Sequence, residues 1–231
     1  FFFQAEDGIR LQGDWSSDVC SSDLSIVVGF SYFWLRLKVF GRNNLPTDGA
    51  YILAPTHRSA MDIPIGAAAS RRRLRFMGKD SLWKIRPIGA ALSALGGFPV
   101  TRGSADIEAL KRCLSVLSEG EPLVLFPEGT RRSGDDIVDL FDGASFLAHK
   151  ANLPVVPVGI YGSEHVMKSG SKRIRRSHCV MSIGEPIHPS VASGTRASRD
   201  DLAAFTERLR QALQIHYDEA RHLAGSHDRA K

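Results

Sequence analysis

A histidine and an aspartate five residues apart, His57 and Asp62, are the residues of this chain best suited to proton transfer. On one continuous helix this separation rotates the chain by about 500°, so the two side chains would lie on different faces. If His57 instead lies in a loop and Asp62 in the first turn of the next helix, the carboxylate can reach the imidazole. The aspartate would then fix the histidine tautomer and prepare the other ring nitrogen as a general base for an alcohol. A structural histidine beside a capping aspartate is the alternative interpretation.

Two further stretches place basic side chains where they could hold a phosphate. The first is FPEGTR at 126–131, in which Arg131 offers a planar guanidinium to a phosphate. In the same stretch Glu128 could accept a hydrogen bond from a substrate hydroxyl, and Gly129 and Thr130 would give a ligand access to the backbone. The second is GGFPVTR at 96–102, which ends in Arg102. An ordinary strand-to-helix turn with a solvated arginine is the alternative for the first stretch.

Short apolar runs alternate with helix-like segments along the chain, which predicts an α/β fold with a mainly parallel sheet. The expected strands are 50–55, 74–77, 96–102, 122–126, 155–161 and 180–183. The expected helices are 59–70, 81–95 with Pro87 near an internal start or kink, 105–118, 141–151 and 198–217. In such sheets functional groups gather beyond the carboxyl ends of the strands, which is where His57, Arg102 and Glu128 fall.

Residues 25–40 (SIVVGFSYFWLRLKVF) are apolar and aromatic but interrupted by two cations. The run is shorter than the roughly 20 apolar residues that a bilayer span requires. It is typical of a helix lying in a membrane interface, with anchors at Phe30, Phe33, Trp34 and Leu37. A helix packed into the core is the alternative, and a longer hydrophobic segment upstream stays open.

The chain has 231 residues and a formal net charge of +5, but its first 24 residues hold one arginine and five acidic residues. The other 207 residues keep 29 of the 30 basic and 20 of the 25 acidic side chains, a net charge of +9, which attracts anionic membranes, phosphorylated substrates or nucleic acid. Residues 1–24 resemble a translated sequencing adapter joined to the reading frame. We therefore predict a non-native or disordered leader, with the genuine sequence starting near residue 25.

Composition limits the classes of fold and function that the chain can have. Hydrophobic residues make up 43% and charged residues 24%, enough apolar material for one domain with a real core. The three cysteines are far apart and form no C-x-x-C pair, so we expect neither a disulfide framework nor a zinc site. We expect the protein to work in a reducing compartment. The basic clusters at 71–75 and 172–176 lack interleaved aromatic residues, which argues against a single-strand nucleic-acid platform. They could bind anionic headgroups or be simple solvated charges.

Four segments in this order resemble the phospholipid/glycerol acyltransferase family over about residues 45–189. His57 and Asp62 match the family's catalytic H-x-x-x-x-D, Arg102 matches its phosphate-binding arginine, and FPEGTR matches its third block. Pro157 matches the proline of the fourth block. The resemblance also places a basic residue near the phosphate at Lys79. The sequence departs from the family at Thr56, where asparagine is common, and at Pro99, where a branched apolar residue is common.

The resemblance implies a mixed, mostly parallel sheet flanked by helices, with a membrane-associating helix at 25–44 and an acyltransferase domain at 45–231. It implies transfer of a fatty acyl group from acyl-CoA or acyl-carrier protein to the free hydroxyl of 1-acyl-glycerol 3-phosphate, giving phosphatidate. His57 would be the base, and the arginines would position the acceptor. No metal or organic cofactor and no nucleic acid are implied, and the expected location is the cytoplasmic side of the cell membrane, peripheral or monotopic.

Three alternatives stay open on the sequence. The acceptor could be another lysophospholipid, glycerol 3-phosphate or a glycolipid alcohol. The chemistry could be hydrolysis through an acyl-enzyme, with Ser59 as the nucleophile. The domain could also bind lipid without catalysis.

Overall fold

The computed structural model describes residues 29, 31–70, 72–94, 96–100, 106–167, 173–190 and 197–228. The predicted leader at 1–24 therefore lies outside the described residues. Seven strands form one sheet in the order β1-β7-β6-β2-β5-β3-β4. Their bounds are Lys38–Phe40 (β1), Ile52–Pro55 (β2), Arg75–Lys79 (β3), Gly97–Val100 (β4), Leu123–Val124 (β5), Val155–Tyr161 (β6) and Val180–Ile183 (β7). All neighbouring strands run parallel except β6 and β7, which confirms the predicted mixed, mostly parallel sheet.

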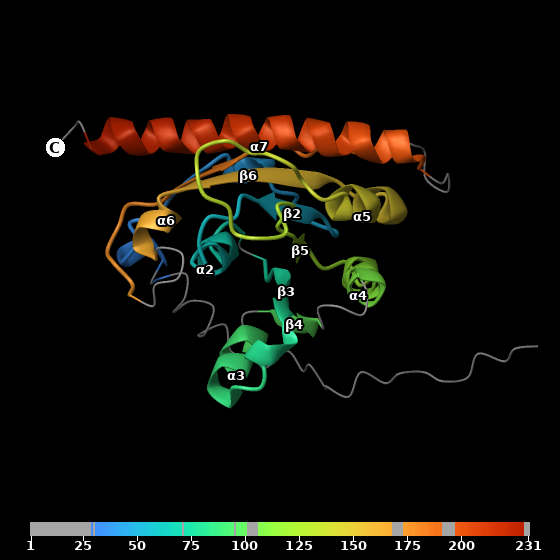
Figure 1. The fold of residues 1–231 in the computed structure, drawn as a ribbon, viewed down its shortest axis with the longest axis horizontal. Helices are drawn as coiled ribbons and strands as arrows, with labels where there is room; N and C mark the ends of the chain where they lie inside the picture. Colours follow the sequence, from blue (N-terminus) through green and yellow to red (C-terminus); the bar gives the residue numbers. More distant parts are fainter. Residues whose placement is uncertain are drawn as a thin grey trace, which may run out of the picture.

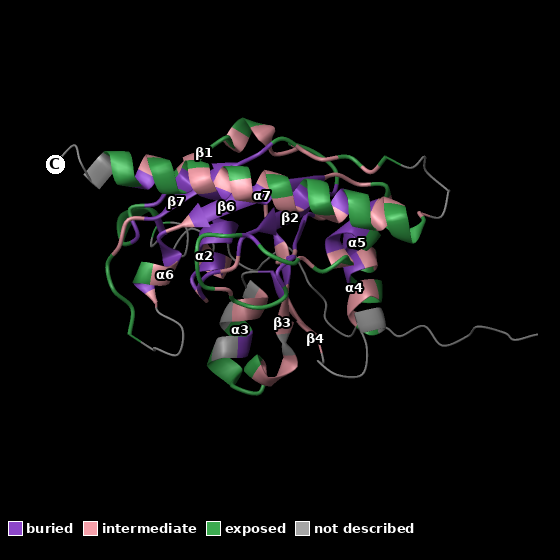
Figure 2. Ribbon diagram, turned by 45° about the horizontal axis from the view of Figure 1, so that its top comes forward, coloured by how far each residue is buried: buried purple, intermediate pink, exposed green. Residues whose placement is uncertain are grey.

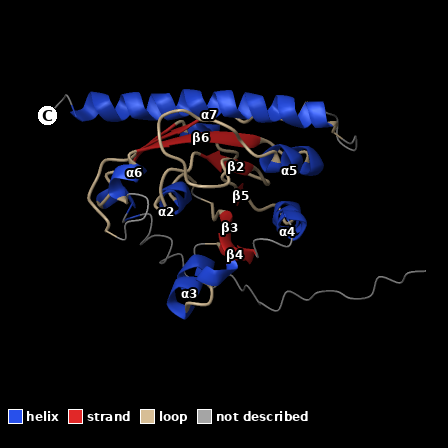
Figure 3. Ribbon diagram, in the orientation of Figure 1, coloured by secondary structure: helices blue, strands red, loops and turns tan. Residues whose placement is uncertain are grey.

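Helices cover both faces of this sheet (Figures 1 and 3). They are α2 (Asp62–Ala67), α3 (Arg86–Ala94), α4 (Asp106–Ser118), α5 (Gly143–Ala151), α6 (Ser163–Val166) and α7 (Arg199–Asp228), with short 3-10 turns η1 (Arg42–Asn44) and η2 (Asp80–Leu82). Successive residues of a strand point to opposite faces. Leu53 accordingly packs in a cluster with Ile65 of α2, whereas Ile52 packs with Leu147 of α5 and Phe205 of α7. The strands β2, β5, β6 and β7 are almost entirely buried between the two layers, whereas the edge strands β1 and β4 are partly exposed (Figure 2).

The carboxyl-terminal helix α7 is longer than predicted and lies unusually close to the sheet. The sequence predicted a helix over 198–217, and the structure extends it to Asp228. Its start is confirmed, because the Asp201 carboxylate accepts a hydrogen bond from the Ser198 N–H and the Ser198 hydroxyl accepts one from the Asp201 N–H. A Cβ on Gly159 of β6 would lie 2.2 Å from the backbone of His216, so only glycine allows this approach.

The prediction of one helix through 25–40 is wrong at its carboxyl end. The described residues are helical only up to Phe33, Arg36 adopts a left-handed φ of 46° that ends the helix, and Lys38–Phe40 form β1. Leu37, predicted as a membrane anchor, is 4% exposed and packs in the core, whereas Phe33 and Trp34 are exposed. Phe30 lies outside the described residues. No helix within the described ranges combines the length and apolar content needed to cross a bilayer.

Other differences concern where elements end. Helix α2 stops at Ala67 instead of residue 70, and β5 keeps two of the five residues predicted for it. The predicted helix over 81–95 is divided into η2 and α3, and Pro87 occupies the first turn of α3, the part of a helix where proline is tolerated. Strands β6 and β7 are confirmed over the predicted residues.

Candidate active site

The loop between β2 and α2 brings His57 and Asp62 together. β2 ends at Pro55, and the Thr56 hydroxyl accepts the Ile160 N–H of β6 at 2.9 Å, which fixes the start of the loop. Asp62 is the first residue of α2, so its side chain can turn back over the loop. Its Oδ2 lies 3.0 Å from His57 Nδ1. This is the geometry that the H-x-x-x-x-D spacing predicted.

One oxygen of Asp62 accepts several hydrogen bonds. Oδ2 also accepts the backbone N–H groups of Arg58 at 2.6 Å and Ser59 at 2.7 Å. The carboxylate is fully buried, so these donors and the positive end of α2 replace the water that a carboxylate would otherwise need. Asp62 is thereby fixed as an acceptor facing the imidazole.

The His57 ring is held on two sides. It stacks on Phe126 with a centroid distance of 4.1 Å and an interplanar angle of 28°, and its side chain is 16% exposed. When Nδ1–H donates to Asp62, the lone pair of Nε2 is the one that can accept a proton. An oriented, partly accessible imidazole of this kind can act as a general base.

Glu128 and Arg58 form a buried ion pair directly beneath this loop. Arg58 Nη1 donates to Glu128 Oε2 at 2.6 Å, and the His57 N–H donates to Glu128 Oε1 at 2.8 Å. Both side chains of the pair are 1% exposed. The sequence predicted that Glu128 would accept a hydrogen bond from a substrate hydroxyl. In the structure both of its oxygens already bind donors of the protein, and the carboxylate is out of contact with solvent.

The FPEGTR turn lies against the histidine loop, because Arg132 N–H donates to the carbonyl of His57 at 2.8 Å. Gly129 has φ +66°, and a Cβ there would lie 2.6 Å from the Phe141 ring, so glycine is required on both counts. The Gly129 and Thr130 N–H groups donate to Phe126 and Glu128 carbonyls, so they are not the open ligand donors that the sequence suggested. Both residues are nevertheless exposed.

Three basic residues were predicted to bind the phosphate, and the structure describes one of them fully. Arg131 is exposed, and its neighbour Arg132 donates its N–H to the carbonyl of His57. Lys79 ends β3, where its Cα pairs with Val100 at the end of β4. Arg102 lies outside the described residues, two positions beyond β4.

The residues of α7 that hold this arrangement were not predicted from the sequence. The Arg58 guanidinium lies 5.1 Å from the centre of the Tyr217 ring, and Arg221 forms an ion pair with Asp135 at 2.5 Å. Gln214 accepts the Ile137 N–H at 2.7 Å. These contacts tie α7 to the histidine loop through Arg58 and to the loop that follows FPEGTR through Asp135 and Ile137. Helical periodicity marks Tyr217 as a buried position, but nothing in the sequence shows which loop it covers.

Ser59 is not arranged as a nucleophile. It is 1% exposed, and its hydroxyl donates to the carbonyl of Met167 at 3.0 Å instead of to His57. Activation of a serine requires a hydrogen bond from its hydroxyl to the base. The geometry therefore argues against Ser59 as a nucleophile.

The first basic cluster is largely engaged inside the protein. Arg72 donates to the carbonyls of Gly49 and Gly120, Arg73 donates to the carbonyl of Ser93, and Arg75 pairs with Glu121. These contacts hold the loops around β3. Arg71 and Lys172 lie outside the described residues, and residues 173–176 of the second cluster are exposed.

Comparisons with known proteins identify the family to which the chain belongs. The Acyltransferase family model matches residues 36–161, more than half of the chain. The chain is 32% identical over 198 residues to the 1-acyl-sn-glycerol-3-phosphate acyltransferase of Bacillus subtilis, covering 84% of this chain and 94% of that protein. It is 30% identical over 165 residues to a chloroplastic 1-acyl-sn-glycerol-3-phosphate acyltransferase of Arabidopsis thaliana, covering 70% of this chain and 46% of that longer protein.

The fold also has a solved counterpart. The crystal structure of the 1-acyl-sn-glycerophosphate acyltransferase PlsC from Thermotoga maritima superposes with a TM-score of 0.69 at 24% identity, covering 84% of this chain and 78% of that one. At this identity the likeness shows a common fold. The matched family model, which contains the His57–Asp62 pair and the FPEGTR turn, together with the Bacillus subtilis relative, shows that the chain belongs to the Acyltransferase family.

Proposed function

We propose that this acyltransferase transfers a fatty acyl group to the free hydroxyl of 1-acyl-glycerol 3-phosphate, forming phosphatidate. The observation that carries the proposal is the His57–Asp62 pair at 3.0 Å with an exposed arginine, Arg131, on the turn bonded to the histidine loop. The relatives named for this activity support the same acceptor.

The residues support a direct transfer of the acyl group, in which His57 takes up one proton and later returns it. His57 Nε2 takes the proton of the acceptor hydroxyl as its oxygen bonds to the carbonyl carbon of the acyl thioester. The tetrahedral intermediate then collapses, and its C–S bond breaks to release the thiolate. The thiolate takes the proton from the imidazolium, which returns His57 to its neutral form. Asp62 stabilises that imidazolium through Nδ1–H throughout. The donor thiol is coenzyme A or acyl-carrier protein in this proposal.

The cations contribute through positioning. Arg131, together with Lys79 and Arg102 as predicted from the sequence, would bind the acceptor phosphate and so decide which hydroxyl meets Nε2. Glu128 would act one step away, by holding the His57 backbone and Arg58. The acceptor is a lipid, so we place the enzyme at the cytoplasmic face of the cell membrane as a peripheral or monotopic protein. The mechanism requires no metal or organic cofactor.

The test is the His57→Ala variant assayed on an acceptor panel. We expect kcat with 1-acyl-glycerol 3-phosphate to fall by about 10²–10⁴-fold, the usual contribution of a general base. His222→Ala, an exposed histidine on α7, is the matched control and should retain wild-type turnover. The panel contains glycerol 3-phosphate, other lysophospholipids and a glycolipid alcohol, with release of the thiol as the measurement.

Two results would overturn the proposal. If the wild-type protein acylates no phosphate-bearing acceptor, the substrate assignment fails. If His57→Ala keeps full turnover, the base assignment fails.

A further inference from the structure

A loop projects from the end of the molecule opposite α7 (Figure 1). We call residues 80–86 the tip; they join β3 to α3. Trp83 fixes the tip from inside: its Nε1–H donates to Ser93 Oγ at 2.9 Å, and its ring packs so closely that a Cβ on Gly78 would lie 2.6 Å from it. A Cβ on Gly89 would likewise lie 3.0 Å from the Trp83 Cα. Trp83 therefore packs the tip against β3 and α3.

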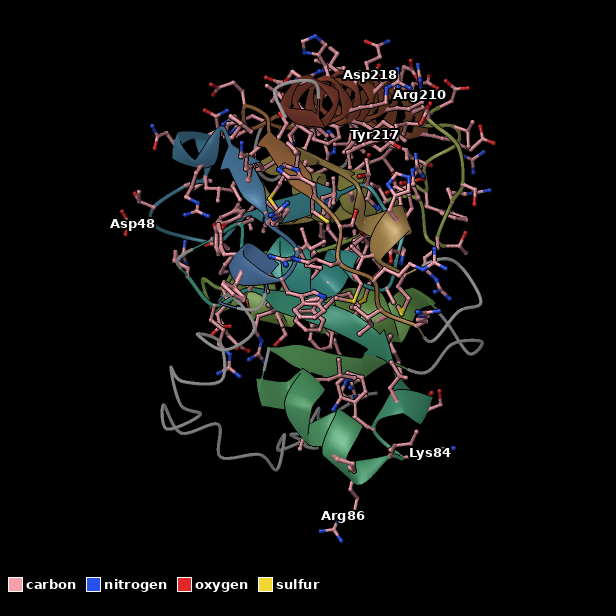
Figure 4. All side chains as sticks on the ribbon, turned by 90° about the vertical axis from the view of Figure 1, so that its left-hand side faces the viewer. Asp48, Lys84, Arg86, Arg210, Tyr217 and Asp218 are labelled. Atoms are coloured by element: carbon pink, nitrogen blue, oxygen red, sulfur yellow. The ribbon has the colours of Figure 1, made fainter. Side chains whose placement is uncertain are left out.

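The outer side of the tip combines exposed aliphatic and basic side chains. Leu82 is 39% and Ile85 is 51% exposed, and Lys84 and Arg86 are exposed beside them. Figure 4 shows Lys84 and Arg86 pointing away from the body, at the far end from Tyr217 and Arg210. Segment 79–86 carries a formal net charge of +2, Asp80 included. Because Trp83 fills the inner side, Leu82 and Ile85 remain exposed and are available to contact an apolar surface outside the protein.

The tip shares an edge of the sheet with the candidate active site. It begins where β3 ends, His57 follows the end of β2, and the FPEGTR turn follows the end of β5. These three strands run parallel, with β5 between the other two, so their carboxyl ends meet at one edge. A surface touched by the tip would lie on the side of the molecule that receives the acceptor.

We propose that the tip is a membrane-contacting loop, which inserts Leu82 and Ile85 among the acyl chains of an anionic bilayer while Lys84 and Arg86 bind its phosphate headgroups. Aliphatic side chains flanked by cations suit this interface, where apolar burial and attraction to anionic lipid add together. The inference rests on the proposed function in one respect: a lipid acceptor makes such a contact useful.

Insertion is measured directly with an environment-sensitive fluorophore at the tip. Ile85→Cys is labelled with a nitrobenzoxadiazole dye in a Cys20→Ser background, since Cys113 and Cys179 are buried. With vesicles of equal parts phosphatidylcholine and phosphatidylglycerol, we expect a blue-shifted, several-fold brighter emission, and a smaller response with phosphatidylcholine alone. Ile215→Cys on α7, which is 63% exposed, is the matched control and should not respond.

The contribution of the cations is measured by vesicle co-sedimentation. Near an anionic surface each cation is worth about a fivefold change in binding, so Lys84→Ser with Arg86→Ser should lower partitioning by about 25-fold. Lys150→Ser, an exposed lysine on α5, should change it little.

Activity separates this inference from the proposed function. Leu82→Ser with Ile85→Ser should lower turnover of vesicle-borne lysophosphatidate at least tenfold and leave turnover of a short-chain, water-soluble lysophosphatidate unchanged. If the wild-type protein acylates neither acceptor, the proposed function fails. The emission of the fluorophore at residue 85 still tests whether the tip inserts into the bilayer. If the fluorophore at residue 85 responds no more than the one at residue 215, or if vesicle binding is unchanged by the tip substitutions, the inference is overturned.

Discussion

At the scale of the residue, the buried Arg58–Glu128 pair connects the two motifs of the site. Glu128 belongs to FPEGTR, Arg58 follows the histidine directly, and the Glu128 carboxylate also accepts the His57 N–H. A buried pair of this kind contributes little net stability compared with apolar residues, but the loss of one partner leaves an uncompensated charge. We therefore interpret the glutamate of FPEGTR as a residue that fixes the backbone of His57, the proposed base.

Glu128→Gln tests this interpretation, because glutamine keeps the shape of the side chain and removes its charge. We expect the free energy of unfolding to fall by about 3–5 kcal/mol, since Arg58 stays buried without a counter-charge. Urea denaturation measures the loss, and a second substitution, Arg58→Met, should recover part of it. Glu207→Gln removes an exposed partner of Arg210 and should leave the midpoint nearly unchanged. If Glu128→Gln keeps full stability and raises only the KM for the acceptor, Glu128 contacts the substrate, as the sequence suggested.

At the scale of the element, α7 belongs to the scaffold of the candidate active site although it lies outside residues 36–161 matched by the family model. Its side chains hold the loop after FPEGTR through Gln214 and Arg221, and Tyr217 lies against Arg58. Tyr217 is 2% exposed, and this burial raises the pKa of its phenol, so it stays neutral at physiological pH. The helix thus supports the His57 backbone through Arg58 and Glu128.

Tyr217→Ala should lower kcat by about 10–100-fold without a matching rise in KM, because small displacements of a positioned base are costly. Tyr217→Phe keeps the ring beneath Arg58 and should retain most of the activity. Initial rates are measured at a temperature where circular dichroism shows each variant to be folded. Wild-type kcat in folded Tyr217→Ala would show that α7 is structural only.

Local patterns predicted those parts of the fold that depend on local sequence. The apolar run of β6 and the loop placement of His57 before a helix were both predicted as found. The strand at 38–40 was missed, because its pairing with β7 depends on residues 142 positions away and its aromatic flank resembles an interfacial helix. The role of Arg58 was not predicted for a similar reason. Its partners come from two distant segments, and spacing within one motif carries no information about them.

At the scale of the whole molecule, the two core clusters on either face of the sheet each enclose a free cysteine. Cys179 lies in the cluster under α2, and Cys113 lies in the cluster under α4, α5 and α7. Burial raises the pKa of each thiol from 9.0 to about 12, so the folded state holds protons that the unfolded state loses above pH 9. Their contribution to stability is complete below about pH 9 and is lost as pH rises towards 12.

Both thiols should therefore resist a disulfide reagent at pH 8, in a Cys20→Ser background, and react only as fast as the protein opens. Absorbance of the released thiolate follows the reaction, with the urea-unfolded protein as the fully reactive control. Rapid reaction of either thiol in the folded protein would contradict the burial seen in the structure.

The pairing of β1 with β7 also sets the order in which the strands can pair during synthesis. Strand β1 pairs only with β7 among the described strands, and β7 ends at Ile183. A ribosome therefore releases Lys38–Phe40 long before their partner strand exists. The segments around the histidine, by contrast, need only residues up to Tyr161 to pair β2 with both β5 and β6. During translation the centre of the sheet can close first, and the amino-terminal edge strand is added last, although it is made first.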